Sequence, residues 1–328
     1  MRAAKVSDLK RWLALGLLVA GCSDAPAEQV TLSFVGDVLL DSKAGRALER
    51  GEDRFAQVSA LLDADISVAN LECPVATVGA AVDKVYTFRA APSTLPRLRE
   101  YFDAVSVANN HSGDYGPQAF QETLGHLRAV KLPYFGGGRD LAEAHAPLLL
   151  RKRGLVIALL GYDDFHPRSF EASPERPGVA WAEDPQIALD IGRARAAGAD
   201  VVLPFMHWGW ENEPAPSERQ RQLARAMIDA GADAVIGAHP HVTQGAEMYR
   251  GKPIIYSLGN FFFDLLDQPE NARGWRLRLV VDRRGVVRFS TTGVRIDDEG
   301  TPFPAPGGAT PCAARGDGAV SSCEGTAR

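Results

Sequence analysis

Four stretches of the chain share one pattern, in which an aspartate opens an apolar run and a polar cluster closes it. These stretches begin at Asp65, Asp103, Asp200 and Asp233. A fifth run, residues 30–37, lacks the leading aspartate but ends in the same way. Short apolar runs that end in turn residues predict buried strands. Because open α/β sheets build their sites at the carboxyl ends of strands, we expect the five polar clusters to lie together.

Helices are predicted between these strands. Ser217, with Gln220 three residues later, forms a capping-box signature, and an apolar stripe follows until Gly231. From Trp275 to Ile296, alternating residues on both sides of a short turn predict an antiparallel hairpin. Alternating strands and helices followed by antiparallel strands predict a layered α/β sandwich in residues 30–298.

The first 21 residues have the features of an export signal. A basic segment precedes a short apolar segment, and small residues follow up to Cys22. This pattern resembles a bacterial lipoprotein signal, which implies cleavage before Cys22 and a lipid on its thiol. Residues 22–29 would then form a tether. We expect an exported protein that is lipid-anchored to a membrane, periplasmic or at the cell surface; a plain secretory signal and an uncleaved anchor are the alternatives.

Composition narrows the possible partners. The chain has 328 residues and a formal net charge of −5, and its basic residues are scattered, so no nucleic acid is expected to bind.

Cys312 and Cys323 lie in a Pro/Gly-rich tail, 299–328, that shows no periodic pattern. In an oxidising compartment a disulfide between them is slightly favoured over two free thiols. Cys73 is predicted to be a buried structural thiol rather than a ligand.

The strand ends carry a set of metal-ligand side chains. On an extended segment His239 and His241 would face the same way. Carboxylates, an amide and imidazoles together suit Mn, Fe or Zn. Because six side chains exceed what one ion needs, two divalent metal ions are predicted, with one carboxylate bridging them, as in metal-assisted phosphoryl hydrolysis. The six candidates are Asp37, Glu72, Asn110, His207, His239 and His241.

A proton donor would complete such a site. His111 adjoins Asn110 and could protonate a leaving oxygen. Each candidate also has a structural alternative: Asp37 and Asn110 as turn caps, His207 as a core histidine and Glu72 as surface charge. Three further histidines, His126, His145 and His166, lie away from strand ends and are predicted to be structural. Gly136 to Gly138 could cradle a phosphate, although a plain turn is favoured.

Six ordered motifs carry a family resemblance. They are Val35-Gly-Asp37-Val-Leu39, Ala69-Asn-Leu-Glu72, Ala108-Asn-Asn-His111 with Asp114-Tyr-Gly116, His207-Trp-Gly209 with Glu211, Gly237-Ala-His239-Pro-His241 and Ser257-Leu-Gly-Asn260-Phe261. Over residues 30–265 the chain resembles the CapA family of capsule and poly-γ-glutamate synthesis proteins, which is related to calcineurin-like metallophosphoesterases. The resemblance implies a four-layer α/β/β/α sandwich. It also implies a dinuclear site with the six ligands above, Glu72 in the bridging position and His111 as the acid.

The remaining motif residues would support the ligands. Those expected to hold them in place are Asn109, Asp114, Glu211 and Asn260. The sequence also departs from the related enzymes. Leu39 stands where metallophosphoesterases place a histidine, and the bridging residue is a glutamate instead of an aspartate. Asn212 follows Glu211 where the family often has tyrosine.

Three functions are compatible with these features. One is a component of capsule or poly-γ-glutamate synthesis with a phosphoesterase-type site, working with a polymer synthase or export complex on a phosphate ester or an anionic polymer. Another is a periplasmic metal-dependent phosphoesterase on a small or lipid-linked phosphate ester. The third is a non-catalytic binding subunit of a polymer synthesis or export complex.

Overall fold

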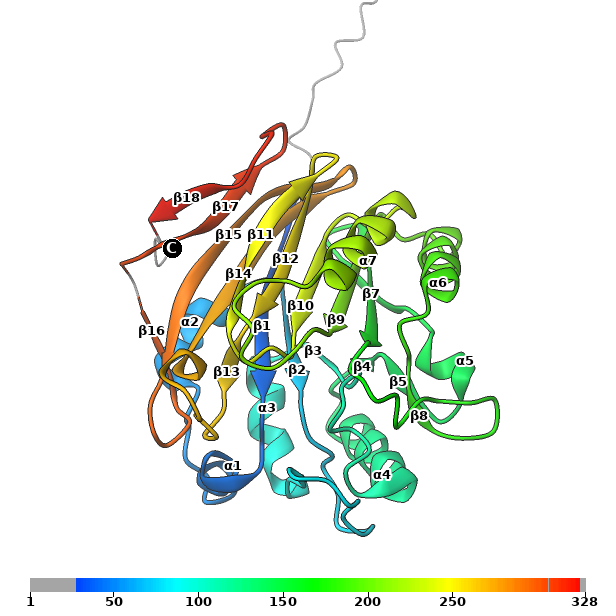
Figure 1. Cartoon of the computed structure of the whole chain (residues 1–328), viewed down its shortest axis with the longest axis vertical. Helices are drawn as coiled ribbons and strands as arrows, with labels where there is room; N and C mark the ends of the chain where they lie inside the picture. Colours follow the sequence, from blue (N-terminus) through cyan, green and yellow to red (C-terminus); the bar gives the residue numbers. More distant parts are fainter. Residues whose placement is uncertain (1–27, 306, 325–328) are drawn as a thin grey trace, which may run out of the picture.

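Two β-sheets stacked face to face form the middle of the molecule (Figure 1). The computed structural model describes residues 28–305 and 307–324. The larger sheet contains β1 (Val30–Val38), β2 (Ile66–Leu71), β3 (Ala104–Ser106), β4 (Tyr134–Phe135), β13 (Asn260–Phe262), β14 (Arg273–Asp282), β15 (Gly285–Ile296), β16 (Pro302–Pro304), β17 (Ala309–Ala314) and β18 (Ser321–Glu324). The second contains β6 (Leu148–Lys152), β7 (Leu155–Asp163), β9 (Val201–His207), β10 (Val235–Ala238), β11 (Thr243–Tyr249) and β12 (Lys252–Leu258).

The strand order brings the predicted strand ends together. The larger sheet runs β18-β17-β15-β14-β1-β2-β3-β4, with β13 beside β1 and β16 beside β15. Its strands β1 to β4 are parallel. The second sheet runs β11-β12-β10-β9-β7-β6, and its four inner strands are parallel. The carboxyl ends of β1, β2 and β3 therefore share one edge, as do those of β9 and β10.

Helices cover the outer faces of both sheets. They are α1 (Ser42–Glu49), α2 (Ser59–Leu62), α3 (Leu95–Tyr101), α4 (Gly116–Ala129), α5 (Leu141–Ala144), α6 (Asp184–Ala196) and α7 (Glu218–Asp229). Short 3₁₀ turns occupy Ala56–Val58, Pro92–Thr94 and Pro269–Ala272, and β5 (Gly137–Gly138) pairs with β8 (Gly178–Val179). The predicted capping box of α7 is confirmed, because Ser217 and Gln220 exchange side-chain to backbone hydrogen bonds.

Three hydrophobic clusters separate four layers. The middle cluster lies between the sheets, where the rings of Phe34 and Phe205 are 6.0 Å apart. A second cluster packs α3 and α4 against the larger sheet, and a third packs α6 and α7 against the other sheet. In Figure 1, α6 and α7 lie on the side of β7, β9 and β10. The predicted four-layer α/β/β/α sandwich is confirmed, as is the hairpin of β14 and β15.

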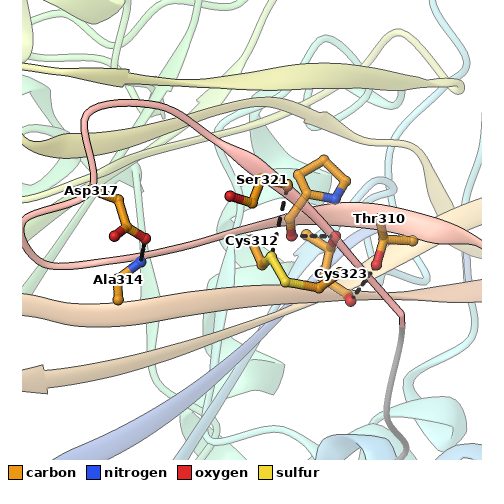
Figure 2. Close-up of a disulfide and its surroundings, with 8 residues drawn as sticks. Thr310, Cys312, Ala314, Asp317, Ser321 and Cys323 are labelled. Carbon is orange, nitrogen blue, oxygen red and sulfur yellow. Dashed lines mark hydrogen bonds between the residues drawn. A yellow bond between two sulfur atoms is a disulfide. The ribbon is translucent and has the colours of Figure 1, made fainter.

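The C-terminal segment differs from the tail that the sequence suggested. Strands β16 and β17 pair with β15, and β18 pairs with β17, so these three strands extend the larger sheet. Cys312 and Cys323 form the predicted disulfide across β17 and β18, with Cα atoms 5.9 Å apart (Figure 2). Proline and glycine interrupt the alternation here, which removes the usual strand signal.

The glycine run at 136–138 is a packed turn, as favoured from the sequence. Gly136 has a φ of 80°, and a Cβ there would lie 2.7 Å from the Cβ of Ala108 and 2.8 Å from the Cα of Gly161. Only glycine fits this left-handed conformation and close approach. Helix α5, which follows, has four residues and is capped by Asp140. The run therefore joins the layers and presents no long helix to a phosphate.

The N-terminal predictions lie outside the described residues. These are the signal in residues 1–21, the lipid-bearing Cys22 and most of the tether. Within the part of the chain that the structure describes, none of the helices combines the length and apolar character that a membrane crossing demands.

Candidate metal centre

Side chains from both sheets converge where the parallel strands end. Asp37 lies at the end of β1, Glu72 just after β2, and His207 at the end of β9. His239 follows β10, and all four of these residues are buried. The structure thus brings the predicted ligands into one place from segments that are far apart in the sequence. His239 N donates to Asp37 Oδ2 across 202 positions.

One group of donors surrounds the ring nitrogen of His207. Its Nε2 lies 2.8 Å from Asn110 Oδ1, 3.0 Å from His239 Nδ1 and 3.6 Å from Glu72 Oε1. Glu72 Oε1 and His239 Nε2 are buried without a hydrogen-bond partner. Buried polar atoms are normally paired, because an unpaired one loses its hydration without compensation. Glu72, His207 and His239 offer ligand atoms within 4.8 Å of one another, as a bound cation requires.

A second group shares the same glutamate. His241 Nδ1 lies 3.3 Å from Asp37 Oδ2, and its Nε2 lies 3.7 Å from Glu72 Oε1. Asp37, Glu72 and His241 again offer ligand atoms within 4.8 Å of one another. Glu211, His239 and His241 form a further such group. The sequence gave Glu211 only a supporting role, but its exposed carboxylate is near enough to bind a cation directly.

The backbone that carries the two histidines is a turn. We predicted that His239 and His241 lie on an extended strand, and this geometry is wrong. Strand β10 ends at Ala238, and His239 and His241 have φ values of 97° and 57°. Non-glycine residues adopt such angles rarely and at a cost, so the surrounding contacts must hold the turn in place. The two imidazole centroids are nevertheless 5.8 Å apart.

Burial and neighbouring charges shift the pKa values in the cluster. Burial, reinforced by the charge of Asp37, raises the pKa of Glu72 well above its ordinary value. Burial lowers the pKa of His239 to about 3 and that of His207 well below its ordinary value. For Asp37, burial works to raise the pKa, but the hydrogen bond and charge of His241 outweigh it and lower the pKa. For His241, burial works to lower the pKa, but the hydrogen bond and charge of Asp37 outweigh it and raise the pKa. Neutral His207 and His239 beside an ionised Asp37 are in the forms that bind metal ions.

His111 lies beside this cluster in a mostly apolar setting. Its ring centroid is 4.5 Å from that of Phe88, and its Nδ1 lies 2.8 Å from Asp114 Oδ2. Burial lowers the pKa of His111, although the Asp114 carboxylate opposes this shift. Lys84 pairs with Asp114, and its Nζ lies 3.3 Å from His111 Nδ1. The hydrogen bond at Nδ1 therefore fixes the orientation of the His111 ring.

The other predicted supporting residues hold the cluster through hydrogen bonds. Asn260 Oδ1 lies 2.8 Å from His241 Nδ1. Asn109 Nδ2 donates to the backbone oxygen of Leu71 (2.8 Å), and Asn109 Oδ1 accepts from His111 N (3.2 Å). Asn109 thus ties the end of β2 to the segment that carries Asn110 and His111.

Two residues at the centre were missed from the sequence. Asn70 Nδ2 donates to Asp37 Oδ1 (2.8 Å) and lies 3.3 Å from His207 Nδ1, so it joins the two sheets at the site. Strand alternation places Asn70 on the same side as Glu72, a signal that could have found it. Lys84 lies on the long loop 74–91, and no sequence pattern identified it as a site residue.

Several residues have the structural roles predicted for them. His145 is buried, and its Nδ1 lies 2.8 Å from Asp190 Oδ2 in the core against α6. His126 lies 3.3 Å from Glu122 on α4. Cys73 is free and buried. Leu39 is also buried and packs in the cluster between the larger sheet and its helices.

Fold and donor set together define a two-sheet α/β sandwich with a buried centre that suits divalent metal ions. The donors are carboxylate oxygens, imidazole nitrogens and an amide oxygen, with two of their atoms unpartnered. This combination matches borderline divalent ions better than Ca²⁺ or Mg²⁺, which prefer oxygen alone.

The family follows from comparison with known sequences. The family model described as "Bacterial capsule synthesis protein PGA_cap" matches residues 31–265, and the chain belongs to this family. It is 36% identical to the "PGA biosynthesis protein CapA" of Bacillus subtilis (strain 168), covering 84% of this chain and 73% of that protein. It is 33% identical to the "Capsule biosynthesis protein CapA" of Bacillus anthracis, covering 77% and 64%.

More distant similarities are weaker. A Mycobacterium tuberculosis protein named "Probable polyglutamine synthesis accessory protein" is 32% identical over 64% of this chain and 57% of its own length. Among solved structures, the NAD nucleotidase of Haemophilus influenzae is similar over 86% of this chain and 54% of that chain, with 13% identity and a TM-score of 0.47.

Proposed function

We propose that this protein is a metal-dependent hydrolase of phosphate esters that acts in capsule or poly-γ-glutamate synthesis. The observation that carries the proposal is the unpartnered Glu72 Oε1, buried between the Nε2 atoms of His207 and His241. A buried carboxyl with an unpartnered oxygen is costly to ionise, as the raised pKa of Glu72 reflects, and a bound cation would remove that cost. The names of its relatives support a place in polymer synthesis.

Two ions account for the donors better than one. Asn110, His207 and His239 would hold one ion, and Asp37 and His241 the other, with Glu72 between them. Mn, Fe and Zn fit this mixture of oxygen and nitrogen donors. Glu211, which is exposed and lies near His241, would add a ligand to the ion held by Asp37 and His241. When bound, such a pair of ions neutralises the charge of a phosphate and lowers the pKa of a water molecule.

The residues around the ions would orient the substrate and move a proton. His111 is fixed at Nδ1 by Asp114, so its Nε2 is the atom that would take up a second proton and, from the charged ring, pass it to a leaving oxygen. Asn260 holds Nδ1 of His241 and so fixes which nitrogen of that ring faces Glu72. Phe88 and Tyr86, which line the opening beside His111, would limit water there.

Metal analysis and kinetics test the proposal. We expect close to two transition-metal ions per purified chain, fewer in His239→Ala, and an unchanged number in His126→Ala, which removes a surface histidine on α4. His111→Ala should retain the metal but lower turnover of an aryl phosphate by about 10²–10⁴-fold. A folded wild type without metal would overturn the proposal. Bound metal without turnover of any ester would favour a non-catalytic binding subunit.

We also propose export and a lipid anchor at Cys22, on the basis of the N-terminal sequence. Cys22→Ser should release the protein from membranes into the soluble fraction after export. Continued retention of the variant in membranes would contradict lipidation at this residue.

A further inference from the structure

A cavity of about 560 Å³ opens directly beside the candidate metal centre. His111 and Asn110 form part of its wall, and so do Val82, Val85 and Phe170. His111, Tyr86 and Glu211 also line the narrower opening that leads to His241, so the cavity and the metal centre are continuous. Its size is that of a pocket for a sizeable organic ligand. A phosphate bound at the centre would direct its organic group into this cavity.

The lining is mainly apolar and carries little positive charge. Lys84 is the single cation among the described lining residues, and it is already paired with Asp114. The same wall contains three acidic residues, Asp83, Asp114 and Glu211. A polyanion such as a glutamate polymer would meet like charges here and too few cations to offset them. The charge of the wall therefore argues against the polymer as the occupant.

Most of the strongly exposed apolar side chains lie on the loop that lines this cavity, and Val82, Val85 and Tyr86 form part of its wall. Among the described residues, six large hydrophobic side chains are strongly exposed, and four of them lie on loop 74–91: Val78, Val82, Val85 and Tyr86. A fifth, Trp210, is adjacent to Glu211. Val85 is 90% exposed. Soluble surfaces rarely concentrate apolar side chains in this way except at binding sites.

The loop is held in position without a ligand. Asp114 Oδ2 accepts from Phe88 N (2.8 Å), and the backbone oxygen of Asp114 accepts from Val82 N (2.9 Å). Lys84 adds its contacts to Asp114 and to the backbone oxygen of Asn110 (3.0 Å). The apolar wall is thus anchored to the segment that carries His111. A preformed wall of this kind lowers the cost of ordering on binding.

We infer that the centre acts on a phosphate ester whose organic group is a long aliphatic chain, as in a lipid phosphate. The phosphate would lie at the metal centre and the chain in the cavity under loop 74–91. This inference rests on the proposed function and names its substrate class. The sixth exposed hydrophobic side chain, Leu189 on α6, lines no part of the cavity and offers a matched control.

The test compares farnesyl phosphate with glycerol 3-phosphate on the metal-loaded full chain. We expect a KM at least tenfold lower for farnesyl phosphate, and tighter binding of it by calorimetry. Val85→Asp and, separately, Val82→Asp should reduce this preference at least fivefold, because each places a charge in the apolar wall. Leu189→Asp should leave the preference unchanged.

Equal KM and equal affinity for the two esters would overturn the inference while leaving phosphate hydrolysis intact. Displacement of farnesyl phosphate by a glutamate oligomer of the same concentration would also overturn it. If no ester is hydrolysed, the calorimetric preference for farnesyl phosphate and its loss in Val85→Asp would still support the ligand class. In that case it is the proposed hydrolase function that fails.

Discussion

At the scale of single residues, the centre is built around a buried carboxyl group that lacks a full set of partners. Glu72 is fully buried, one of its oxygens has no partner, and the neighbouring carboxylate of Asp37 repels it. The imidazoles of His207 and His239 are held as neutral ligands, with the pKa of His239 lowered to about 3. Such an arrangement favours cation binding at the expense of the stability of the metal-free protein.

Replacing this glutamate should therefore have opposite effects on metal binding and on stability. For Glu72→Gln we expect metal affinity to fall by at least about tenfold. The metal-free variant should be more stable than the metal-free wild type by about 1 kcal/mol at neutral pH, because the buried carboxyl must take up a proton on folding and the amide need not. Metal titration and denaturant unfolding of both proteins measure the two effects. A metal-free variant less stable than the wild type would show that Glu72 is already balanced.

At this scale, the residues that stand directly at strand ends could be predicted from the sequence. His239 and His241 were found, although the predicted reason was wrong, because positive φ angles and not strand alternation set their directions. Lys84 could not be found. It reaches Asp114 from the middle of a loop, and the contact depends on a backbone path that has no periodic signal.

At the scale of elements, the apolar runs predicted the parallel strands well, because strands buried on both faces are almost continuously hydrophobic. The C-terminal strands lacked that pattern, since one of their faces is open and proline interrupts them. Side-chain contacts attach these strands to the rest of the larger sheet. Arg315, which follows β17, makes two hydrogen bonds to Asp282 at the end of β14, at 2.8 and 2.7 Å.

This ion pair gives a testable pH dependence. The hydrogen bonds from Arg315, against the opposing effect of burial, lower the pKa of Asp282. A lowered carboxyl pKa contributes stability above the unfolded pKa of about 3.9, and that contribution is lost as the pH falls through the lower folded value. Arg315→Met should cost about 2 kcal/mol at neutral pH and flatten the stability curve below pH 4. Urea unfolding at several pH values measures both.

Lys252→Met offers a comparison, because that lysine also contacts a buried aspartate, Asp233, but lies on β12 in the other sheet. An Arg315→Met variant with the acid dependence of the wild type would show that Asp282 is stabilised mainly by other contacts.

At the scale of the whole molecule, two sheets meet to make one centre. Periodicity predicted alternating strands and helices but could not assign strands to sheets, because pairing depends on contacts between segments far apart in sequence. The four layers came from the family resemblance. Asn70, which reaches Asp37 on its own sheet and His207 on the other, shows how side chains at the site also join the layers.

Metal removal should consequently weaken the entire fold. An ion that binds only the folded state contributes about 2.7 kcal/mol at a free concentration of 100 times its Kd. We expect a chelator to lower the Tm of the wild type and added Mn or Zn to restore it. His239→Ala should respond much less to either. A Tm that does not change with chelator, in protein shown to contain metal, would contradict coupling of the centre to the fold.

The hydrogen bond from His239 to Asp37 closes a loop of 202 residues. A nascent or truncated fragment that ends before His241 lacks one of the proposed metal ligands. Ion content per chain is therefore a direct count of fully folded molecules. During biogenesis, loading must come after β10 has docked and placed His239 and His241, so a secreted chain would acquire its ions in the compartment where this docking takes place.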